Sequence, residues 1–456
     1  MINSAISYFD SNYSQLISEL NEFLSIASVS TAPEHLANVQ KAANFIAEKL
    51  RAIGMENVQV FPTPRHPIVF AEYLHAGPSQ PTILIYGHYD VQPEDPAELW
   101  NTPPFTPTII GDNLYARGAS DMKGQIYACV SAIQSIKSTG ELPVNIKFIL
   151  EGEEEIGSPN LKDFLTAKKD LLKSDVALNP DAGMSRKDLP SITYGLRGLS
   201  YFELNIYGPD HDLHSGSYGG IVHNPAQVLA DLISKMHDEN GKVMLPGFYD
   251  LVKPLPETER AELAKYSTTE AEYLAQTGVP ALWGEEEYSP SERIGARPTL
   301  EVNGILSGFT GEGSKTIIPA KAMAKISTRL VPDQKPELVY GQLSTFLQTN
   351  APKTVRWELK ELSCGSPSIS DITMPATKAL AAAFEEVWGT SPAFKREGGS
   401  VPVVADMQEI LGIDSVLTGF GLPDDRIHSP NEKLDLPTWK KGVHALIHFF
   451  FNAKRQ

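Results

Sequence analysis

The chain contains very little cysteine: Cys129 and Cys364 are its 2 cysteines in 456 residues. Two thiols cannot form a disulfide framework, which excludes the small secreted domains that depend on several disulfides. We interpret both residues as buried thiols, since free cysteine behaves as a small apolar side chain. The sequence therefore favours a reducing, cytoplasmic location.

The chain also lacks an excess of positive charge. It has 39 Lys and Arg residues against 56 Asp and Glu residues, a formal net charge of −17. Nucleic acids and anionic membrane surfaces attract proteins through clustered Lys and Arg. The charge balance therefore argues against both partners and favours a small-molecule substrate.

No long apolar run is present. The segment from Ala445 to Phe451 is interrupted by His448, and it is far shorter than the roughly 20 residues that span a bilayer. The N-terminal 30 residues lack the basic and apolar regions of a signal peptide and instead show a helical apolar face. We expect a soluble protein with no membrane partner.

The apolar pattern predicts an α/β fold. Strands are expected at 57–62, 67–75, 81–87, 144–150 and 175–179, and helices are expected near the N-terminus, from Pro33 to Gly54, and after Met122. Strands that alternate with helices favour a mostly parallel central sheet flanked by helices. A chain of this length also favours two domains.

The pattern changes at about residue 195. A strand near 200–208, a helix near 224–240, strands near 298 and 324, and a helix near 335–349 indicate a separate α+β module. We predict a catalytic domain formed by residues 1–194 and 374–456, with residues 195–373 as an inserted lid and dimerisation domain. The acidic segment 254–297 is expected to be a long loop with short helices.

Histidine and acidic residues follow several of the predicted strands. The motifs are GHYD at 87–90, GASDMKG at 118–124, EGEEEIG at 151–157, PDAGM at 180–184 and DRIHSPNE at 425–432. In an open α/β sheet, side chains at the carboxyl ends of the strands face a crevice. Imidazole and carboxylate groups in this number suffice for two divalent ions that share one carboxylate.

The run Glu153, Glu154 and Glu155 is the strongest single signal. Three adjacent acids repel one another unless cations neutralise them. One glutamate could ligate a metal while its neighbour acts as general base. Taken alone, each motif has an ordinary alternative: a turn for HxD, a helix N-cap for Asp121 and a solvated loop for the acids. Their occurrence together favours a metal site.

This ordered set of motifs resembles the di-metal aminoacyl hydrolases that include carnosinase and cytosolic nonspecific dipeptidase. Acetylornithine deacetylase and succinyl-diaminopimelate desuccinylase are more distant relatives. The resemblance covers nearly the whole chain and implies two zinc or manganese ions. It implies that one ion takes His88 and Asp181, the other Glu155 and His428, with Asp121 bridging. It also implies that Glu154 is the general base and that Asp90 supports His88.

The same resemblance assigns residues outside the metal motifs. DLHSGSYGG implies that His214 reaches into the active site of the partner protomer in a homodimer, where it helps to hold the developing oxyanion. Thr316, Arg329 and Ser400 match substrate-binding positions. Arg329 is suited to a substrate carboxylate because a guanidinium group pairs with it through two hydrogen bonds. The family pattern further predicts a cis peptide bond between Asp121 and Met122.

We therefore expect a cytoplasmic, homodimeric metallodipeptidase that hydrolyses short peptides with a free C-terminal carboxylate. A first alternative is a deacylase of N-acetyl or N-succinyl amino acids with the same metals. A second is a metal-binding protein without turnover. GHYDVQP and DLHSGSYGG favour the dipeptidase branch, and the presence of every ligand and the base argues against a protein without turnover.

Overall fold

The computed structural model describes residues 1–265, 267–399 and 401–455. The chain divides into two compact units. The first comprises Met1–Tyr194, Ser370–Lys395 and Asp406–Gln456, and the second comprises Gly195–Ile369 and Arg396–Ala405. Residues 396–405 thus group with the second unit, although the sequence analysis placed them in the last catalytic segment.

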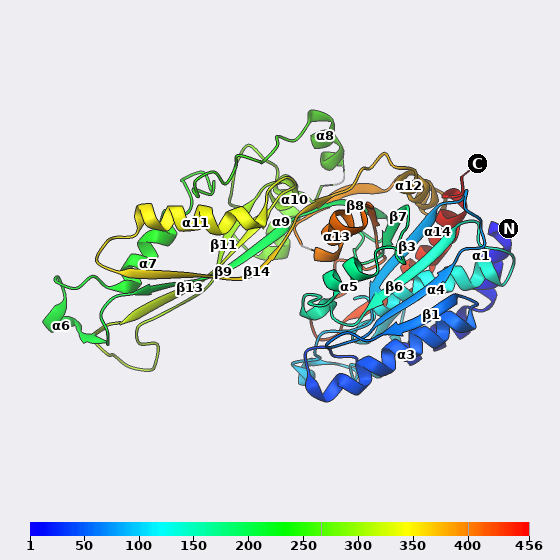
Figure 1. Cartoon of the computed structure of the whole chain (residues 1–456), viewed down its shortest axis with the longest axis horizontal. Coiled ribbons are helices and arrows are strands. Elements are labelled where there is room, and N and C mark those ends of the chain that lie inside the picture. Colours follow the sequence, from blue (N-terminus) through cyan, green and yellow to red (C-terminus); the bar gives the residue numbers. More distant parts are fainter. Residues whose placement is uncertain (266, 400, 456) are drawn as a thin grey trace. The chain divides into compact units, whose positions relative to one another are not determined.

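The first unit is built on a nine-stranded sheet with the order β1-β2-β6-β3-β7-β17-β8-β15, in which β16 also pairs with β8. Strands β6, β3, β7 and β17 are parallel, and the strands at both edges are antiparallel. Every residue of β6 and β7 is buried, as expected for parallel strands covered on both faces. The predicted α/β class is confirmed, with parallel pairing at the centre of the sheet (Figure 1).

The strands of this sheet are β1 (Glu56–Phe61), β2 (Ile68–Tyr73), β3 (Thr82–His88), β6 (Asn145–Glu151), β7 (Val176–Asn179), β8 (Ser191–Leu196), β15 (Ser368–Ile369), β16 (Ala393–Glu397) and β17 (Ser415–Leu417). A smaller sheet contains β4 (Thr108–Ile110), β5 (Asn113–Tyr115) and β18 (Lys433–Asp435). The helices are α1 (Ile2–Ser11), α2 (Tyr13–Leu24), η1 (Pro33–His35), α3 (Leu36–Ala52), η2 (Ala97–Leu99), α4 (Lys123–Lys137), η3 (Glu154–Ile156), α5 (Leu161–Ala167), α12 (Pro375–Trp388), η4 (Met407–Leu411) and α14 (Leu436–Asn452).

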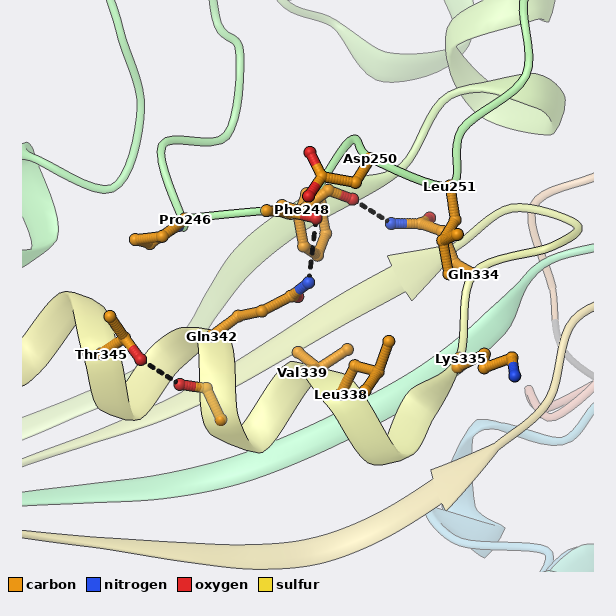
Figure 2. A pocket seen from close by; sticks show the side chains of 12 residues that line it. Pro246, Phe248, Asp250, Leu251, Gln334, Lys335, Leu338, Val339, Gln342 and Thr345 are labelled. Atoms are coloured by element: carbon orange, nitrogen blue, oxygen red, sulfur yellow. Dashed lines mark hydrogen bonds between the residues drawn. The ribbon is translucent and has the colours of Figure 1, made fainter.

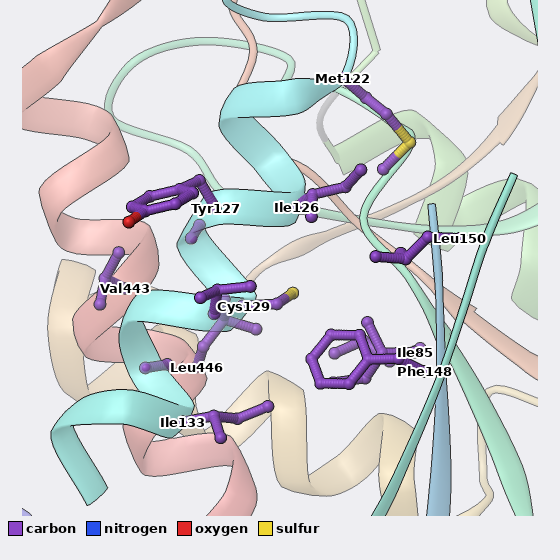
Figure 3. Close-up of a cluster of buried hydrophobic side chains, with 14 of the residues drawn as sticks. Ile85, Met122, Ile126, Tyr127, Cys129, Ile133, Phe148, Leu150, Val443 and Leu446 are labelled. Atoms are coloured by element: carbon purple, nitrogen blue, oxygen red, sulfur yellow. The ribbon is translucent and has the colours of Figure 1, made fainter. Parts of the chain in front are cut away.

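Helix α4 lies at the centre of the core of the first unit. Figure 3 shows it between the sheet, represented by Ile85 and Phe148, and helix α14, represented by Val443. Cys129 is buried on this helix, and burial raises the pKa of its thiol to about 12. Cys364 is exposed, so the prediction of a second buried thiol was wrong: its strand β14 lies at the edge of a sheet, where side chains face solvent.

The second unit is an α+β module. Its four-stranded antiparallel sheet has the order β11-β13-β9-β14. Helices α7 and α11 pack on one face (Figure 1), where Leu229 and Leu343 contact a core that includes Phe202 and Ile206. Burial alternates along β13, as expected for a sheet with one covered face.

The strands of the second unit are β9 (Gly198–Tyr207), β10 (Leu213–His214), β11 (Thr299–Ser307), β12 (Ile317–Ile318), β13 (Lys321–Leu330) and β14 (Arg356–Gly365). Its helices are α6 (Ser215–Tyr218), α7 (Pro225–Ser234), α8 (Glu257–Lys265), α9 (Glu270–Thr277), α10 (Pro290–Ala296), α11 (Pro336–Asn350) and α13 (Pro402–Asp406). Among the described residues of either unit, no helix combines the length and the apolar character needed to cross a bilayer.

The acidic segment 254–297 contains the short helices α8, α9 and α10. A buried ion pair fixes its end: Arg297 donates two hydrogen bonds of 2.7 Å to the carboxylate of Glu285. Both side chains are 9% exposed, and the guanidinium group lies over the ring of Tyr288, 4.3 Å from its centroid. The end of this segment is therefore fixed by a specific ion pair, although most of the segment is exposed to solvent.

Replacing Glu285 with alanine should leave the Arg297 charge buried without its carboxylate. We expect the free energy of unfolding to fall by about 3 kcal/mol, the usual result of removing one partner of a buried ion pair. Denaturant unfolding monitored by circular dichroism measures this change. Glu287→Ala, at an exposed position of the same turn, is the control and should be nearly neutral. Equal stability of the two variants would contradict the conclusion that the Glu285–Arg297 ion pair stabilises the fold.

Candidate metal centre

Three neighbouring parallel strands deliver the candidate ligands to one edge of the first sheet. Strand β3 ends at His88, β6 leads through Glu151 into η3, and β7 ends two residues before Asp181. Because β3 pairs in parallel with both β6 and β7, their carboxyl ends meet at the same edge. Asp121 enters this region just before α4, and His428 enters just before β18.

Asp121 lies between two histidines. Its Oδ1 atom is 3.2 Å from Nε2 of His88, and its Oδ2 atom is 2.9 Å from Nε2 of His428. On the first side, His88 Nε2 is also 3.9 Å from Oδ1 of Asp181. On the second side, His428 Nε2 is 3.2 Å from Oε2 of Glu155. Each oxygen of one carboxylate thus faces a different group of ligands.

These side chains fit a pair of divalent ions. His88, Asp121 and Asp181 form one set, and Asp121, Glu155 and His428 form another; within each set the ligand atoms lie within 4.8 Å of one another. These two sets are the groupings that the family resemblance implies, and a third set within the same distance consists of His88, Glu154 and Glu155. Imidazole with carboxylate oxygen is a donor combination typical of zinc and manganese, and a carboxylate can bridge two ions.

Glu154 adjoins both sets, with its Oε2 atom 4.0 Å from Nε2 of His88. Its pKa is raised to about 9, mainly because the carboxyl group is buried; the charge of His88 lowers the pKa, and the charges of Asp181, Glu155 and Asp121 raise it. Burial opposes protonation of His88, but hydrogen bonds to Asp121 and Asp90 outweigh this effect and hold its pKa well above the usual value. Burial opposes ionisation of Asp121, but the two histidines act in the opposite direction, and their hydrogen bonds and charges hold its pKa below the usual range.

Asp90 is fully buried and fixes two parts of this site. Its carboxylate accepts hydrogen bonds from the backbone N–H groups of Glu154 and Glu155, at 3.3 and 3.1 Å. Nδ1 of His88 lies 3.1 Å from the carbonyl oxygen of Asp90 and 3.5 Å from its carboxylate. With these acceptors beside Nδ1, the imidazole presents Nε2 to the other ligands.

Glu153 differs from its two neighbours. Its carboxylate is buried, at 2% exposure, and accepts hydrogen bonds from the hydroxyl of Thr63, the backbone N–H of His66 and the amide of Asn160. Neutral donors therefore stabilise this carboxylate. The expectation that cations neutralise the whole glutamate run was wrong for Glu153, because its neighbours in the fold supply enough N–H and O–H groups.

Gln92 is a residue of the site that the sequence analysis missed. Its Nε2 atom donates a 2.7 Å hydrogen bond to Oε2 of Glu155, the oxygen that faces His428. Its position in the sequence, two residues after Asp90, could have indicated this role, because alternate side chains of an extended backbone point to the same side. Gln92 thus orients the Glu155 carboxylate.

The loop that carries His428 has an unusual backbone. His428 has a φ of 59°, and Arg426 and Asn431 also have positive φ values, of 56° and 65°. Residues with side chains seldom adopt this left-handed region, so contacts must hold the loop. Asn431 supplies two: it accepts from the N–H of Asn101 at 2.7 Å and donates to the carbonyl of Leu99 at 2.8 Å.

The peptide bond between Asp121 and Met122 is cis, as predicted. Met122 is fully buried and packs in the core beside Ile126 (Figure 3). The residue that follows the candidate bridging ligand is thus anchored in the core just before α4.

The second unit contains three of the predicted substrate-binding residues. His214 is exposed on β10, and its Nδ1 atom accepts a hydrogen bond from the N–H of Gly216 at 3.0 Å. Thr316 lies beside it, because its carbonyl accepts from the N–H of Ser215 at 3.0 Å. Arg329 is half-buried near the end of β13. Ser400 lies outside the described residues.

Arg329 lines a cavity of about 350 Å³ within this unit, whose charged lining consists of Arg197, Arg293, Arg297, Glu285 and Glu301 besides Arg329 itself. Burial lowers the pKa of the Arg329 guanidinium, but an arginine remains charged under ordinary conditions. A carboxylate is the natural ligand for a guanidinium group held in this way.

Another cavity of the second unit contains none of the predicted site residues. Figure 2 shows this cavity, of about 510 Å³, between α11 and the turn at 246–251. The amides of Gln334 and Gln342 donate to the carbonyls of Phe248 and Gly247. These side chains hold the turn against the helix, so we assign them a structural role.

The fold and the metal-ligand arrangement define a metal-dependent hydrolase, and comparison with known proteins gives its family. The sequence profile of peptidase family M20/M25/M40 matches residues 84–452. The chain belongs to this family and is a metallopeptidase. The resemblance inferred from the motifs is confirmed.

Relatives match over nearly the whole chain. The Cys-Gly metallodipeptidase DUG1 of Candida albicans is 34% identical, over 96% of this chain and 95% of the relative. The Beta-Ala-His dipeptidase of Homo sapiens is 31% identical, over 99% and 92%. The solved structure of an M20 family metallo-carboxypeptidase, Sso-CP2 from Sulfolobus solfataricus, is 35% identical with a TM-score of 0.87, over 96% of this chain and 99% of that chain.

Replacing His428 with alanine should remove one ligand from the second set while leaving His88, Asp121 and Asp181 in place. We expect one tightly bound ion per chain in this variant and two in the parent protein. Elemental analysis after gel filtration measures the content. Replacing His444, which contacts Asp10 on α1, provides a histidine control that should retain two ions. Two ions in His428→Ala would contradict the ligand assignment.

Proposed function

We propose that this chain is a dipeptidase in which two divalent ions share Asp121 and Glu154 acts as general base. The observation that carries the proposal is the position of Asp121, with one oxygen toward His88 and the other toward His428, beside the half-buried carboxylate of Glu154. The relatives support a dipeptide substrate because their names give Cys-Gly and beta-Ala-His.

When bound, the ions would lower the pKa of water and polarise the substrate carbonyl. The chain's own contribution to the proton transfers is Glu154. It takes a proton from the attacking water and delivers it to the nitrogen of the leaving amine. The backbone N–H groups of Glu154 and Glu155 are fixed by Asp90, so the base and the neighbouring ligand keep a constant relative position.

Substrate recognition is assigned to residues of the second unit. Arg329 pairs with the free C-terminal carboxylate of the substrate, which favours peptides whose C-terminus is not blocked. Thr316 and Ser400 complete this recognition. His214, from the partner protomer of a homodimer, donates to the carbonyl oxygen as negative charge develops on it. The exposed position of His214 on its own unit supports a contact with a second copy.

Three further features belong to this proposal. The ions are zinc or manganese, which suit imidazole and carboxylate donors. The second unit forms the dimer contact. The protein acts in the cytoplasm, where the free thiols of Cys129 and Cys364 would remain reduced.

The substrate class is tested by stripping the protein of metal, reloading it with Zn²⁺ or Mn²⁺, and measuring amine release. The substrates are free dipeptides, tripeptides, and the matching N-acetyl and N-succinyl amino acids. Preferential cleavage of free dipeptides supports the proposal. Cleavage confined to N-acyl amino acids would identify a deacylase, and equal cleavage of longer peptides from the C-terminus would identify a carboxypeptidase like the Sulfolobus relative.

Glu154→Gln keeps the size of the side chain but removes its ability to accept a proton as a carboxylate. We expect kcat to fall by about 10²–10⁴-fold, the usual contribution of a general base, while the content of bound metal remains near that of the parent. Initial rates and elemental analysis measure the two quantities. Asp163→Asn, an exposed acid on α5, is the control and should retain full activity. A Glu154→Gln variant with near-parental kcat would exclude Glu154 as the base.

His214 acts in the partner's site in this proposal, so two inactive variants should complement each other. The His214→Ala variant cannot supply an imidazole to the site of its partner, and the Glu154→Gln variant lacks the general base in its own site. In a mixed dimer one site would receive both wild-type groups. After denaturation and joint refolding of equal amounts, random pairing should restore about a quarter of parental activity. Activity no higher than the average of the two separate variants would show that His214 does not act across a dimer.

A further inference from the structure

Glu432 is a fully buried carboxylate behind the candidate metal ligands. It lies one residue before β18, in the same loop as His428. Both of its oxygens are used: Oε2 accepts from Arg117 Nη1 at 2.7 Å and from the N–H of Gly118 at 3.0 Å. Oε1 accepts from the N–H groups of Ser120 and Asp121 at 2.9 and 3.0 Å. One carboxylate thus receives four donors from the segment 117–121.

The backbone of this segment requires such an acceptor. Gly118 has a φ of +81°, and a Cβ atom there would lie 2.6 Å from the side chain of Val91. The resulting turn directs successive N–H groups toward one point, an arrangement that binds an anion. All four partners are donors, so this position requires an acceptor at both ends of the side chain, which a carboxylate supplies and a carboxamide does not.

Strand pairing holds Glu432 in this position. β18 pairs with β5, with Lys433 opposite Tyr115, and the N–H of Ala116 donates to the carbonyl of Glu432 at 3.2 Å. The loop carrying His428 and the segment carrying Asp121 are therefore joined by a backbone hydrogen bond close in sequence to both ligands. Ser120 adds a second link through its hydroxyl, which donates to Asp425 at 2.8 Å.

We propose that Glu432, paired with Arg117, is a positioning residue that fixes the shared ligand Asp121 relative to His428. It acts through the backbone and contacts neither substrate nor ions. The proposal rests on the two-ion site of the proposed function. Glu432 accepts a hydrogen bond from the N–H of Asp121 itself. We therefore expect it to fix the position of Asp121 within the second set of ligands.

Glu432→Gln tests this inference because glutamine has the same shape but can accept on only one side. Its NH₂ group would face either Arg117 and Gly118 or Ser120 and Asp121. We expect the affinity for at least one ion to fall about 10–100-fold, the usual effect of losing an outer-shell partner. Competition titration of the metal-free protein with Zn²⁺ and a chromophoric chelator measures both affinities. The absorption spectrum of the Co²⁺-loaded protein should also change, and excess metal should partly restore activity.

Glu19→Gln is the matched control. Glu19 is a partly buried acid that accepts from Lys49 and Tyr127, far in sequence from the ligands. It should lose stability without a change in metal affinity or Co²⁺ spectrum. If Glu432→Gln does not fold, Arg117→Lys replaces it; this variant keeps the positive charge, loses the fork of hydrogen bonds and should bind metal more weakly than the parent.

The outcomes separate the inference from the proposed function. A parent protein that binds fewer than two ions would contradict the two-ion site itself. The positioning role alone would be overturned if the parent binds two ions and the folded Glu432→Gln variant has the metal affinity and Co²⁺ spectrum of the parent. Arg117→Lys takes the place of Glu432→Gln in this comparison if the latter does not fold. Weakened metal binding with an unchanged Glu19→Gln control would support it.

Discussion

The mutual repulsion of carboxylates around His88 is the constraint on which the site depends. Asp121, Glu154, Glu155 and Asp181 lie at one edge of the sheet, where partial burial makes each charge costly. Histidines face the two oxygens of Asp121, and backbone N–H groups of Glu154 and Glu155 donate stabilising hydrogen bonds to the carboxylate of Asp90. Divalent ions would resolve the remaining repulsion, which is why the arrangement is chemically reasonable as a metal centre and unreasonable as a packed core.

The supporting structure consists largely of acids that are satisfied by the protein itself. Glu153 joins the loops at 63–66 and 160, and Glu432 joins the loops that carry Asp121 and His428. Such carboxylates accept several charge-assisted hydrogen bonds and therefore fix backbone segments firmly. The first unit thus uses acidic side chains for two purposes: some line the candidate metal centre, and others accept hydrogen bonds from the backbone that surrounds it.

Much of this organisation could be predicted from the sequence. The strand that ends at His88 and the helix that begins after Met122 follow from apolar periodicity and local turn residues. The short helices in 254–297 were also expected, and they occur as α8, α9 and α10. The candidate metal ligands were predicted from the resemblance of the ordered motifs to a known family, and the structure brings these side chains together.

Other features depend on contacts between distant segments and could not be read from local pattern. Glu153 points toward Thr63 and Asn160, whereas an acidic run by itself does not show which member turns inward. Glu432 is 311 residues from Asp121 in sequence, and its function becomes visible only when β18 pairs with β5. The exposure of Cys364 likewise follows from the edge position of β14.

The most direct test of this account is a crystal structure of the metal-loaded protein with anomalous diffraction data collected at the zinc absorption edge. The account predicts two anomalous peaks about 3.5–4 Å apart, one bound by His88 and Asp181, the other by Glu155 and His428, with Asp121 bound to both. Peaks at other residues, or a single peak that does not contact Asp121, would contradict it.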